Sequence, residues 1–437
     1  MKTSKTEIGL IPDDWEVVRF GAKVDVFRGG SPRPIETFLT TNSNGINWIK
    51  IGDVRPNDKY IVCTQEKIIP AGVQFSREVH KGDFILSNSM SFGRPYILNI
   101  DGCIHDGWLA IQNYNETFDT DFLYYLLGSD EVFKQYVQMA AGSSVQNLNK
   151  EKVKHLQIPF PPLPEQHRIA KALSDVDAVI STIEKLIQKK KNIKQGAMQN
   201  LLTGKKRLPG FATASKLKQT ELGEIPEEWE VKALQDIFEF RPNNTFTRDN
   251  LNDSEGIYQN IHYGDILIKY PSILDCSKES IPYVNQNIQV KYSNYGIKEG
   301  DIIIADTAED ETVGKVVEIY NLGDRKLVSG LHTFLCRKIT DDFASRWLGY
   351  FMNQSIFHNQ ILSFITGTKV SAISRSAIQN LKVLIPPKSE QTAIANVLSS
   401  MDKEIETLNT KLEKYRNLKT AMMQQLLTGK IRLLKSK

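Results

Sequence analysis

Residues 161–205 read PPLPEQHRIAKALSDVDAVISTIEKLIQKKKNIKQGAMQNLLTGK, and residues 386–430 read PPKSEQTAIANVLSSMDKEIETLNTKLEKYRNLKTAMMQQLLTGK. The two stretches align without a gap at an offset of 225 residues, inside a longer match between 142–208 and 367–433. Both open on Pro-Pro-x-x-Glu-Gln and close on Leu-Leu-Thr-Gly-Lys. A gap-free match of this length indicates a tandem duplication, so we expect two copies of one structural unit.

Apolar residues recur within both stretches in steps of mostly three and four. A repeat near 3.5 residues over several turns is typical of a coiled coil. Pro164 suits a first helical turn, while Gly204 and Gly429 suit helix ends. The predicted seam residues are Ile169, Leu173, Val176, Ile180, Ile183 and Ile187 in the first helix, and Ile394, Leu398, Met401, Ile405, Leu408 and Leu412 in the second.

The expected length of these helices bears on what buries their seams. About 38 residues at 1.5 Å each give roughly 57 Å, which is longer than a small domain is wide. An amphipathic helix packed only on its own domain is the alternative interpretation, and this length argues against it. We therefore expect the two helices to pack against each other as an antiparallel coiled-coil spacer.

Shorter repeats extend the duplication over the rest of the chain. TEIGLIPDDWEV at 6–17 returns as TELGEIPEEWEV at 220–231, and KGDFIL at 81–86 returns as EGDIII at 299–304. Apolar runs after Gly-Asp turns predict strands at 265–268 and 301–304, and helices are expected near 121–138 and 342–357. The predicted class is α+β, with a first domain at 1–163, a spacer helix at 164–204, a linker at 205–219, a second domain at 220–388, a distal helix at 389–429 and a tail at 430–437.

The loops of the two predicted domains differ more than their frameworks. Side chains of Arg, Asn, Ser and His in loops can reach base edges or phosphates, although the same residue types are ordinary in turns. Both interpretations stay open for any single residue. The candidate DNA-binding residues are Arg28, Ser31, Arg33, Asn88, Ser89 and Arg94 in the first domain, and Arg241, Asn243, Asn244, Arg248, Asn260 and His262 in the second.

Composition excludes several classes of protein. Hydrophobic residues make up 41% and charged residues 24% of the 437 residues, which suits globular domains with buried cores. No stretch approaches the roughly 18 consecutive apolar residues of a membrane span, and the polar N-terminus has no signal-peptide core. We therefore expect a cytoplasmic protein without membrane contact. The cysteines lack zinc-ligand spacing and no metal site is predicted; they are Cys63, Cys103, Cys276 and Cys336.

Charge is distributed unevenly along the chain. Residues 165–210 carry a net charge of +6 and residues 390–437 carry +4, while the whole chain carries +4. The rest of the chain therefore carries a net charge of −6. DNA reading by the predicted domains would depend on local patches of positive charge. The lysine run at 189–191 with Lys194 would suit phosphate contacts or an ordinary solvated helix face.

The motifs of the common DNA-modifying enzymes are absent from this sequence. There is no G-x-x-x-x-G-K-[ST] phosphate loop, no G-x-G-x-x-G and no Asn/Asp-Pro-Pro-aromatic tetrapeptide. The nearest match to the last, FPPL at 160–163, lacks the amide or carboxylate that would hold a target amine. A protein without catalysis of its own is expected.

Taken together, the motifs resemble the specificity subunits of type I restriction–modification enzymes. The openings at 7–15 and 221–229, the Gly-Asp-led strands, the Pro-Pro entries and the Leu-Leu-Thr-Gly ends follow the order of that family over essentially the whole chain. The resemblance implies two recognition domains that read the two parts of a split target in double-stranded DNA. The helical pair would set the gap between the parts.

The resemblance also implies partner subunits. Two modification subunits would dock on the spacer and methylate adenine with S-adenosylmethionine, and restriction subunits would use ATP and Mg²⁺. These cofactors would belong to the partners, and none is expected on this chain. The alternative is a coiled-coil scaffold with two protein-binding domains and no DNA contact, which the negative charge outside the helices favours slightly.

Overall fold

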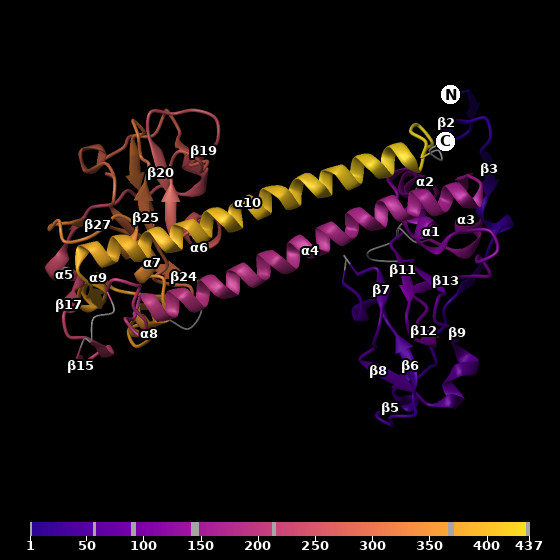
Figure 1. Cartoon of the computed structure of the whole chain (residues 1–437), viewed down its shortest axis with the longest axis horizontal. Helices are drawn as coiled ribbons and strands as arrows, with labels where there is room; N and C mark the ends of the chain where they lie inside the picture. The colour runs from indigo at the N-terminus through magenta and orange to yellow at the C-terminus, as the bar shows by residue number, and fades with distance from the viewer. Residues whose placement is uncertain are drawn as a thin grey trace. The chain divides into compact units, whose positions relative to one another are not determined.

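The computed structural model describes residues 2–55, 58–88, 93–140, 148–211, 216–365 and 371–433. The chain divides into unit 1, Met1–Lys185 with Thr410–Lys437, and unit 2, Leu186–Asn409. Two helices of 39 residues each, α4 (Leu163–Leu201) and α10 (Lys388–Leu426), contribute to both units. They are the long magenta and yellow helices of Figure 1. Each unit therefore combines one α+β domain with one half of each long helix.

The α+β domain of unit 1 is built on two five-stranded sheets, ordered β4-β13-β10-β11-β7 and β5-β8-β6-β12-β9. Most neighbouring strands are antiparallel, but β7 pairs with β11 and β6 with β12 in parallel. The first sheet consists of β4 (Asp25–Arg28), β13 (Trp108–Gln112), β10 (Phe84–Ser87), β11 (Pro95–Leu98) and β7 (Tyr60–Ile61). The second consists of β5 (Leu39–Thr40), β8 (Glu66–Ile68), β6 (Ile46–Ile49), β12 (Gly102–Ile104) and β9 (Arg77–Val79).

The core of unit 1 joins the first sheet to the helices. It contains Phe84 of β10 together with Phe122 of α1 (Thr120–Leu127), and it also contains Leu173 of α4 and Leu426 of α10. Helices α2 (Asp130–Ala140) and α3 (Lys150–Lys154) complete the domain. The ends of the long helices are thus parts of the domain core, which ties them to the domain by the burial of apolar side chains.

Unit 2 repeats this plan with a five-stranded sheet ordered β18-β27-β23-β25-β21 and a four-stranded sheet ordered β19-β22-β20-β26. The parallel pairs recur as β21 with β25 and β20 with β26. The strands are β18 (Phe238–Arg241), β27 (Thr333–Lys338), β23 (Ile302–Ala305), β25 (Val316–Tyr320), β21 (Ile273–Asp275), β19 (Leu251–Asn252), β22 (Tyr283–Val284), β20 (Gln259–Ile261) and β26 (Leu327–Ser329). The predicted α+β class, with two domains that are each followed by a long helix, is confirmed.

Three local predictions were wrong. The expected helix near 121–138 is two helices, because Ser129 ends α1 by donating to the Leu126 carbonyl and accepts from the Val132 amide of α2. The helix expected near 342–357 is likewise split into α7 (Trp347–Phe351) and α8 (Ser355–Leu362). The strand expected at 265–268 is part of helix α6 (Tyr263–Ile268), whose first turn is capped by the His262 ring.

In each unit the strand that follows the Ile-Pro-x-x-Trp motif pairs with the strand that leads into the long helix. These antiparallel pairs are β3 (Glu16–Arg19) with β14 (Gln157–Phe160), and β17 (Glu230–Ala233) with β29 (Lys382–Ile385). The indole of Trp15 donates to Glu165 at 3.0 Å, and that of Trp229 donates to Glu390 at 3.0 Å. The Ile-Pro-x-x-Trp openings and the Glu-Gln entries, far apart in the sequence, therefore form one buried contact in each unit.

The long helices run antiparallel within each unit. In unit 1 Lys419 of α10 pairs with Asp177 of α4, and Arg416 of α10 pairs with Glu184 of α4. The residue numbers on α10 therefore fall as those on α4 rise. Unit 2 shows the same order in the pair of Lys190 with Glu404 and in the ion pair of Lys194 with Asp402. All twelve residues of the predicted seam are buried or half-buried. The antiparallel packing predicted from the seam is confirmed.

The helices end at Leu201 and Leu426, three residues before the glycine that was expected to end them. Gly204 (φ +72°) and Gly429 (φ +69°) follow in the left-handed conformation, which favours glycine. A Cβ at position 429 would lie 2.4 Å from Cδ of Pro12, and one at 204 would lie 2.6 Å from Cδ of Pro226. The glycine of each Leu-Leu-Thr-Gly motif thus lets the backbone pass close to the proline of the Ile-Pro-x-x-Trp motif in the same unit.

Replacing Gly429 with alanine is expected to lower the free energy of unfolding of unit 1 by about 2–4 kcal/mol, because left-handed strain adds to a clash with Pro12. Urea denaturation followed by tryptophan fluorescence measures it. Gly210→Ala is the matched control, since Gly210 has φ +92° but nothing within 4 Å of an added Cβ. Equal losses in the two variants would show that the contact with Pro12 is without consequence.

Candidate nucleic-acid interface

The candidate residues of the first domain differ in how far they reach into solvent. Arg28, Arg33 and Arg94 are exposed and Ser31 is half-buried, whereas Asn88 is only 3% exposed. Ser89 lies outside the described residues. The Asn88 amide donates to the Asp106 carbonyl at 2.9 Å, and its backbone N–H donates to the Gly107 carbonyl. Asn88 therefore supports a turn, while DNA contact by the exposed residues stays a prediction.

That turn carries two residues that the sequence did not single out, His105 and Asp106. The Ser31 hydroxyl donates to Oδ1 of Asp106 at 2.7 Å, and Nε2 of His105 lies 3.0 Å from the same oxygen. Nη2 of Arg33 lies 3.7 Å from Oδ2 of Asp106. We name these four residues the domain 1 polar cluster. The only hint in the sequence is the polar His-Asp pair between an apolar run and Gly107.

The backbone beneath the domain 1 polar cluster is tightly packed. A Cβ on Gly29 would lie 2.1 Å from the His105 carbonyl oxygen, so only glycine fits there. Burial by itself raises the pKa of Asp106, but the Ser31 hydrogen bond, the neighbouring His105 ring and the charge of Arg33 outweigh it and hold this pKa below its usual value. Asp106 is therefore an ionised acceptor on a rigid support.

The arginines of the second domain have acidic partners. Arg248 makes two hydrogen bonds to Asp265, at 2.7 and 2.9 Å, and Arg241 lies 2.5 Å from Glu239. The Asn243 amide donates to the Gly330 carbonyl. Asn244, Asn260 and His262 are buried, with exposed fractions of 4%, 0% and 6%. Asn244 and His262 make hydrogen bonds that hold loops, whereas the buried side chain of Asn260 has no hydrogen-bond partner among the described residues. Contact by the exposed arginine Arg248 stays a prediction.

The second domain has its own polar group, which joins the corresponding turn at His332 to the segment that follows β23. Oδ1 of Asp306 accepts from the Thr307 hydroxyl at 2.7 Å and lies 3.2 Å from Nδ1 of His332. We name these three residues the domain 2 polar cluster. The ring of Tyr263 packs edge-on against His332, with centroids 5.3 Å apart. Each domain thus groups a carboxylate, a histidine and a hydroxyl beside the turn that leads into β13 or β27. In the second domain only His332 lies on that turn, because Asp306 and Thr307 follow β23.

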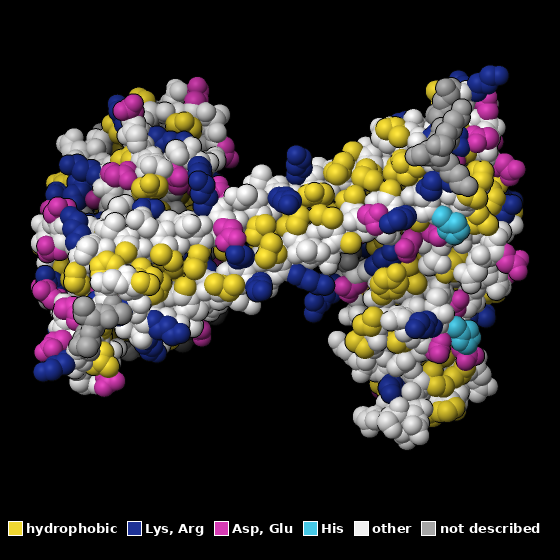
Figure 2. Space-filling view, in the orientation of Figure 1, with side chains coloured by type: hydrophobic (Ala, Val, Ile, Leu, Met, Phe, Trp, Pro, Cys, Tyr) yellow, Lys and Arg dark blue, Asp and Glu magenta, His cyan; other side chains and the backbone are white. Residues whose placement is uncertain are grey.

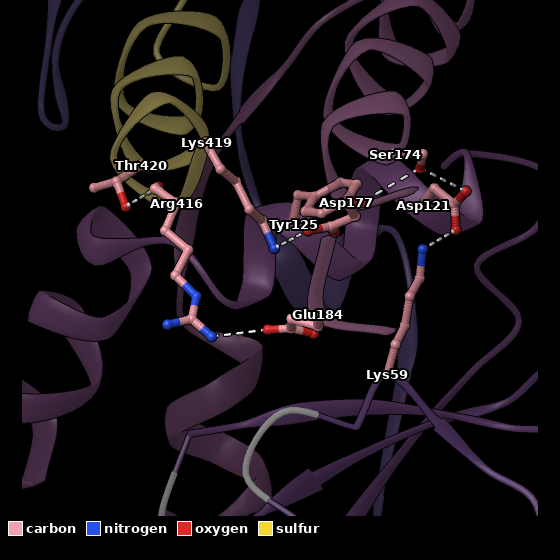
Figure 3. A network of polar contacts seen from close by, with 9 residues as sticks. All are labelled: Lys59, Asp121, Tyr125, Ser174, Asp177, Glu184, Arg416, Lys419 and Thr420. Carbon is pink, nitrogen blue, oxygen red and sulfur yellow. Dashed lines mark hydrogen bonds and ion pairs between the residues drawn. The ribbon is translucent and has the colours of Figure 1, made fainter. Parts of the chain in front are cut away.

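A network of polar contacts joins the first domain to both long helices (Figure 3). The Tyr125 hydroxyl of α1 donates to Asp177 of α4 at 2.7 Å, and Nζ of Lys419 of α10 lies 2.7 Å from the same carboxylate. Burial raises the pKa of Tyr125, which keeps the phenol a donor. Unit 2 has the same three-element contact at an offset of 225 residues, between Tyr350, Asp402 and Lys194.

The two networks differ beside this shared contact. In unit 1 Asp121 of α1 accepts from Lys59 at 2.7 Å and from Ser174 of α4 at 3.1 Å (Figure 3). Unit 2 has Arg346 in place of Asp121, and its guanidinium donates to Ser399 and Asn396 of α10. Each domain is therefore fixed to its helix halves by directional bonds, which position the loops of that domain.

Replacing Asp177 or Asp402 with asparagine should lower the free energy of unfolding by about 1–2 kcal/mol, because the amide can still bind the tyrosine but loses the charge that holds the lysine. Asp175→Asn is the control, since that exposed carboxylate pairs, within the described residues, with Lys171 one turn away on the same helix and should matter little. Chemical denaturation measures the free energies of unfolding. A loss no larger than that of the control would show that the tyrosine–aspartate–lysine contacts do not stabilise the units.

Charge on the surface is mixed. On the face drawn in Figure 2, Lys and Arg side chains alternate with Asp and Glu over both domains, and no broad basic field is visible. In the lysine run of α4, Lys190 and Lys194 are paired with glutamate and aspartate, while Lys189 and Lys191 are exposed. DNA contact would therefore depend on small patches, as the charge distribution predicts.

In the described part of the chain, none of the helices is both long and apolar enough to cross a membrane. Within the same residues, no three or more His, Cys, Asp or Glu side chains are placed to hold a metal ion.

The comparisons with known proteins agree with each other. The family model for the type I restriction modification DNA specificity domain matches residues 12–195 and 226–414. Two proteins of Methanocaldococcus jannaschii are similar along the chain. The type I restriction enzyme MjaVIII specificity subunit is 27% identical over 97% of this chain and 94% of its own, and the putative MjaX specificity subunit is 29% identical over 98% and 96%.

One solved chain shares the fold. It comes from a study of complex assembly and conformational transition of the type I R-M system, and it aligns with a TM-score of 0.57 at 16% identity over 96% of this chain and 99% of its own. The family model covers both halves of the duplication and most of the residues. The resemblance drawn from the sequence motifs is confirmed, and the chain belongs to the type I restriction–modification DNA specificity family.

Proposed function

We propose that this chain reads a split sequence in double-stranded DNA, with one α+β domain for each part, and that it catalyses nothing itself. The observation that carries the proposal is the pairing of a duplicated framework with unlike polar clusters. The strands around the two turns correspond, but one domain groups Ser31, Arg33, His105 and Asp106 beside its turn, and the other groups Asp306, Thr307 and His332. A framework that is shared and side chains that differ suit two heads that read different sequences.

The long helices would set the gap between the two parts of the target. Support for this role is that each helix runs through both units, from one domain core to the other: Leu173 belongs to the core of unit 1 and Leu201 to that of unit 2. A helix has a fixed rise per residue, so its length can act as a ruler.

The partners would be two modification subunits that methylate adenine with S-adenosylmethionine, and restriction subunits that use ATP and Mg²⁺. A groove that recurs in both units supports binding of the same partner twice. In unit 1 it has a volume of about 510 Å³ and is lined by Ile8, Asp130 and Gln424 among others. In unit 2 a groove of about 780 Å³ is lined by the corresponding Leu222, Ser355 and Gln199.

The groove of unit 1 is the more apolar of the two. Met423 near the end of α10 and the buried Leu427 just after it line the groove, together with Leu10, which is 61% exposed. Figure 2 shows hydrophobic side chains gathered over the same end of α10. Exposed apolar surface of this kind suits a protein partner, since water would otherwise solvate it at a cost in free energy.

Methylome sequencing tests the function directly. A host that carries the cognate modification subunit is compared with and without this chain. We expect adenine methylation at one split motif only when the chain is present, because the partner would have no sequence preference of its own. Methylation at the same motif without the chain, or DNA binding by the assembled complex that shows no sequence preference, would refute the proposal in favour of a scaffold.

A further inference from the structure

The domain 1 polar cluster and His332 of the domain 2 polar cluster lie at corresponding turns of the duplicated framework, the turns that lead into β13 and β27. In unit 1, Ile104 of β12 pairs in parallel with Ile49 of β6, and His105 and Asp106 follow directly. In unit 2, Ser329 of β26 pairs in parallel with Ile261 of β20, and the turn to His332 follows. If the two domains read different bases, the difference must lie where corresponding backbone carries unlike side chains. These turns meet that condition.

Among the described residues, one carboxylate oxygen of the domain 1 polar cluster accepts no hydrogen bond. The Gly107 N–H donates to Nδ1 of His105 at 2.9 Å, so Nε2 carries the ring proton and faces Oδ1 of Asp106. Oδ1 also accepts from Ser31. Oδ2 is left facing Arg33, whose side chain is 82% exposed and whose Nη2 lies 3.7 Å away, too far for a hydrogen bond. An acceptor and a guanidinium fork therefore stand side by side at the surface.

The major-groove edges of the base pairs discriminate between possible ligands. A G·C pair presents two adjacent acceptors, N7 and O6 of guanine, and then the N4 amino donor of cytosine. An A·T pair presents its donor between two acceptors, N7 of adenine and O4 of thymine. The Arg33 guanidinium offers two donors beside the single acceptor of Asp106, and this order complements the G·C edge but not the A·T edge. We propose that Arg33 and Asp106 together read one C·G base pair, with Asp106 accepting from cytosine N4 and Arg33 donating to guanine.

Within the described residues, the domain 2 polar cluster contains no arginine. In the domain 2 polar cluster Oδ1 of Asp306 is held by Thr307 and His332, and the nearby Arg248 is held by both oxygens of Asp265. The corresponding position therefore reads its base pair in another way, and the C·G pair read by Arg33 and Asp106 belongs to one half of the target. This inference rests on the proposed function.

Methylome sequencing of variants tests the assignment in the complete complex. Asp106→Asn should lower the preference for cytosine at one position about fivefold or more, with adenine gaining, because an asparagine side chain matches N6 and N7 of adenine. Arg33→Lys should weaken the sequence preference at that same base pair, since lysine keeps the positive charge but lacks the paired donors of the guanidinium. Arg33 is so exposed that this variant leaves the fold intact. All other positions of both half-sites should remain as in the parent chain.

Controls separate this inference from the proposed function. Asp175→Asn, a carboxylate on the α4 surface, should leave the motif unchanged. The assignment is overturned if the two variants keep the parent motif, if they affect different base pairs, or if the parent motif has no C·G pair in either half. In each of those outcomes the parent chain still directs a split motif. Failure of the proposed function itself is distinct, because then the parent chain directs no motif at all.

Discussion

Replacing Arg432 with alanine should lower the free energy of unfolding of unit 1 by about 3–5 kcal/mol, the usual cost of leaving one member of a buried ion pair alone. Arg432 follows the end of α10, and its guanidinium donates to Glu165 at the start of α4 and to Asp14 at 2.8 and 2.9 Å. The Glu165 side chain is 3% exposed and that of Arg432 is 12% exposed. The variant would strand a carboxylate in the core beside Trp15.

Unit 2 supplies an internal replicate of this experiment. Arg207, after the end of α4, donates to buried Glu390 at 2.6 Å and to Glu228 at 2.8 Å. Arg207→Ala should weaken unit 2 by a similar amount and leave unit 1 unchanged. Hydrogen exchange measured by peptide assigns each loss to its unit, which matters because a chain of two units need not unfold in one step.

Two further variants test the cause of the loss. Arg416→Ala should cost no more than about 1 kcal/mol, because Arg416 and its partner Glu184 are 46% and 45% exposed. Adding Glu165→Gln to Arg432→Ala should restore part of the stability, since glutamine can accept from Trp15 without a buried charge. If the double variant is as unstable as the single one, the loss comes from packing of the arginine and not from an unpaired charge.

Lengthening both long helices by seven residues should lengthen the gap of the methylated motif by up to about three base pairs, because seven residues add about 10.5 Å and a base pair adds about 3.4 Å. Seven residues are two turns of the coiled-coil repeat, so the seam stays in phase. The insertions belong after Lys185 and after Asn409, at the boundaries between the two units, where each unit keeps all of its own residues.

Methylome sequencing measures the new gap, and the two half-sites should keep their sequences. Insertion of seven residues in α4 alone is the matched control. It leaves the helices unequal, and the antiparallel contacts of one unit would have to shift, so loss of methylation is expected. A folded, active double-insertion variant that still methylates the parent gap would show that the helices do not set the spacing.

Part of the candidate interface was predictable from the sequence and part was not. Exposed Arg33 in a loop with Gly29 and Ser31 was identified by residue type. Asn88 and Asn260 were selected on the same grounds, yet both are buried. Residue type says what a side chain can bind, and only the surrounding chain decides whether it faces solvent. His105 and Asp106 were missed because they become a candidate only beside Ser31, 75 residues from Asp106 in the sequence.

The sequence by itself determined the duplication, the α+β class, the two long helices and their seams. These features are repeated or periodic along the chain, so they can be counted without knowing any contact. It also determined the family, through motifs whose order is fixed. The tertiary structure alone decided that Arg432 pairs with Glu165, 267 residues away, and that the Trp15 indole donates to the same carboxylate. It also decided that the apolar run after the Gly-Asp at 265 forms helix α6. Those outcomes depend on hydrogen bonds and burial between distant segments, which no local pattern encodes.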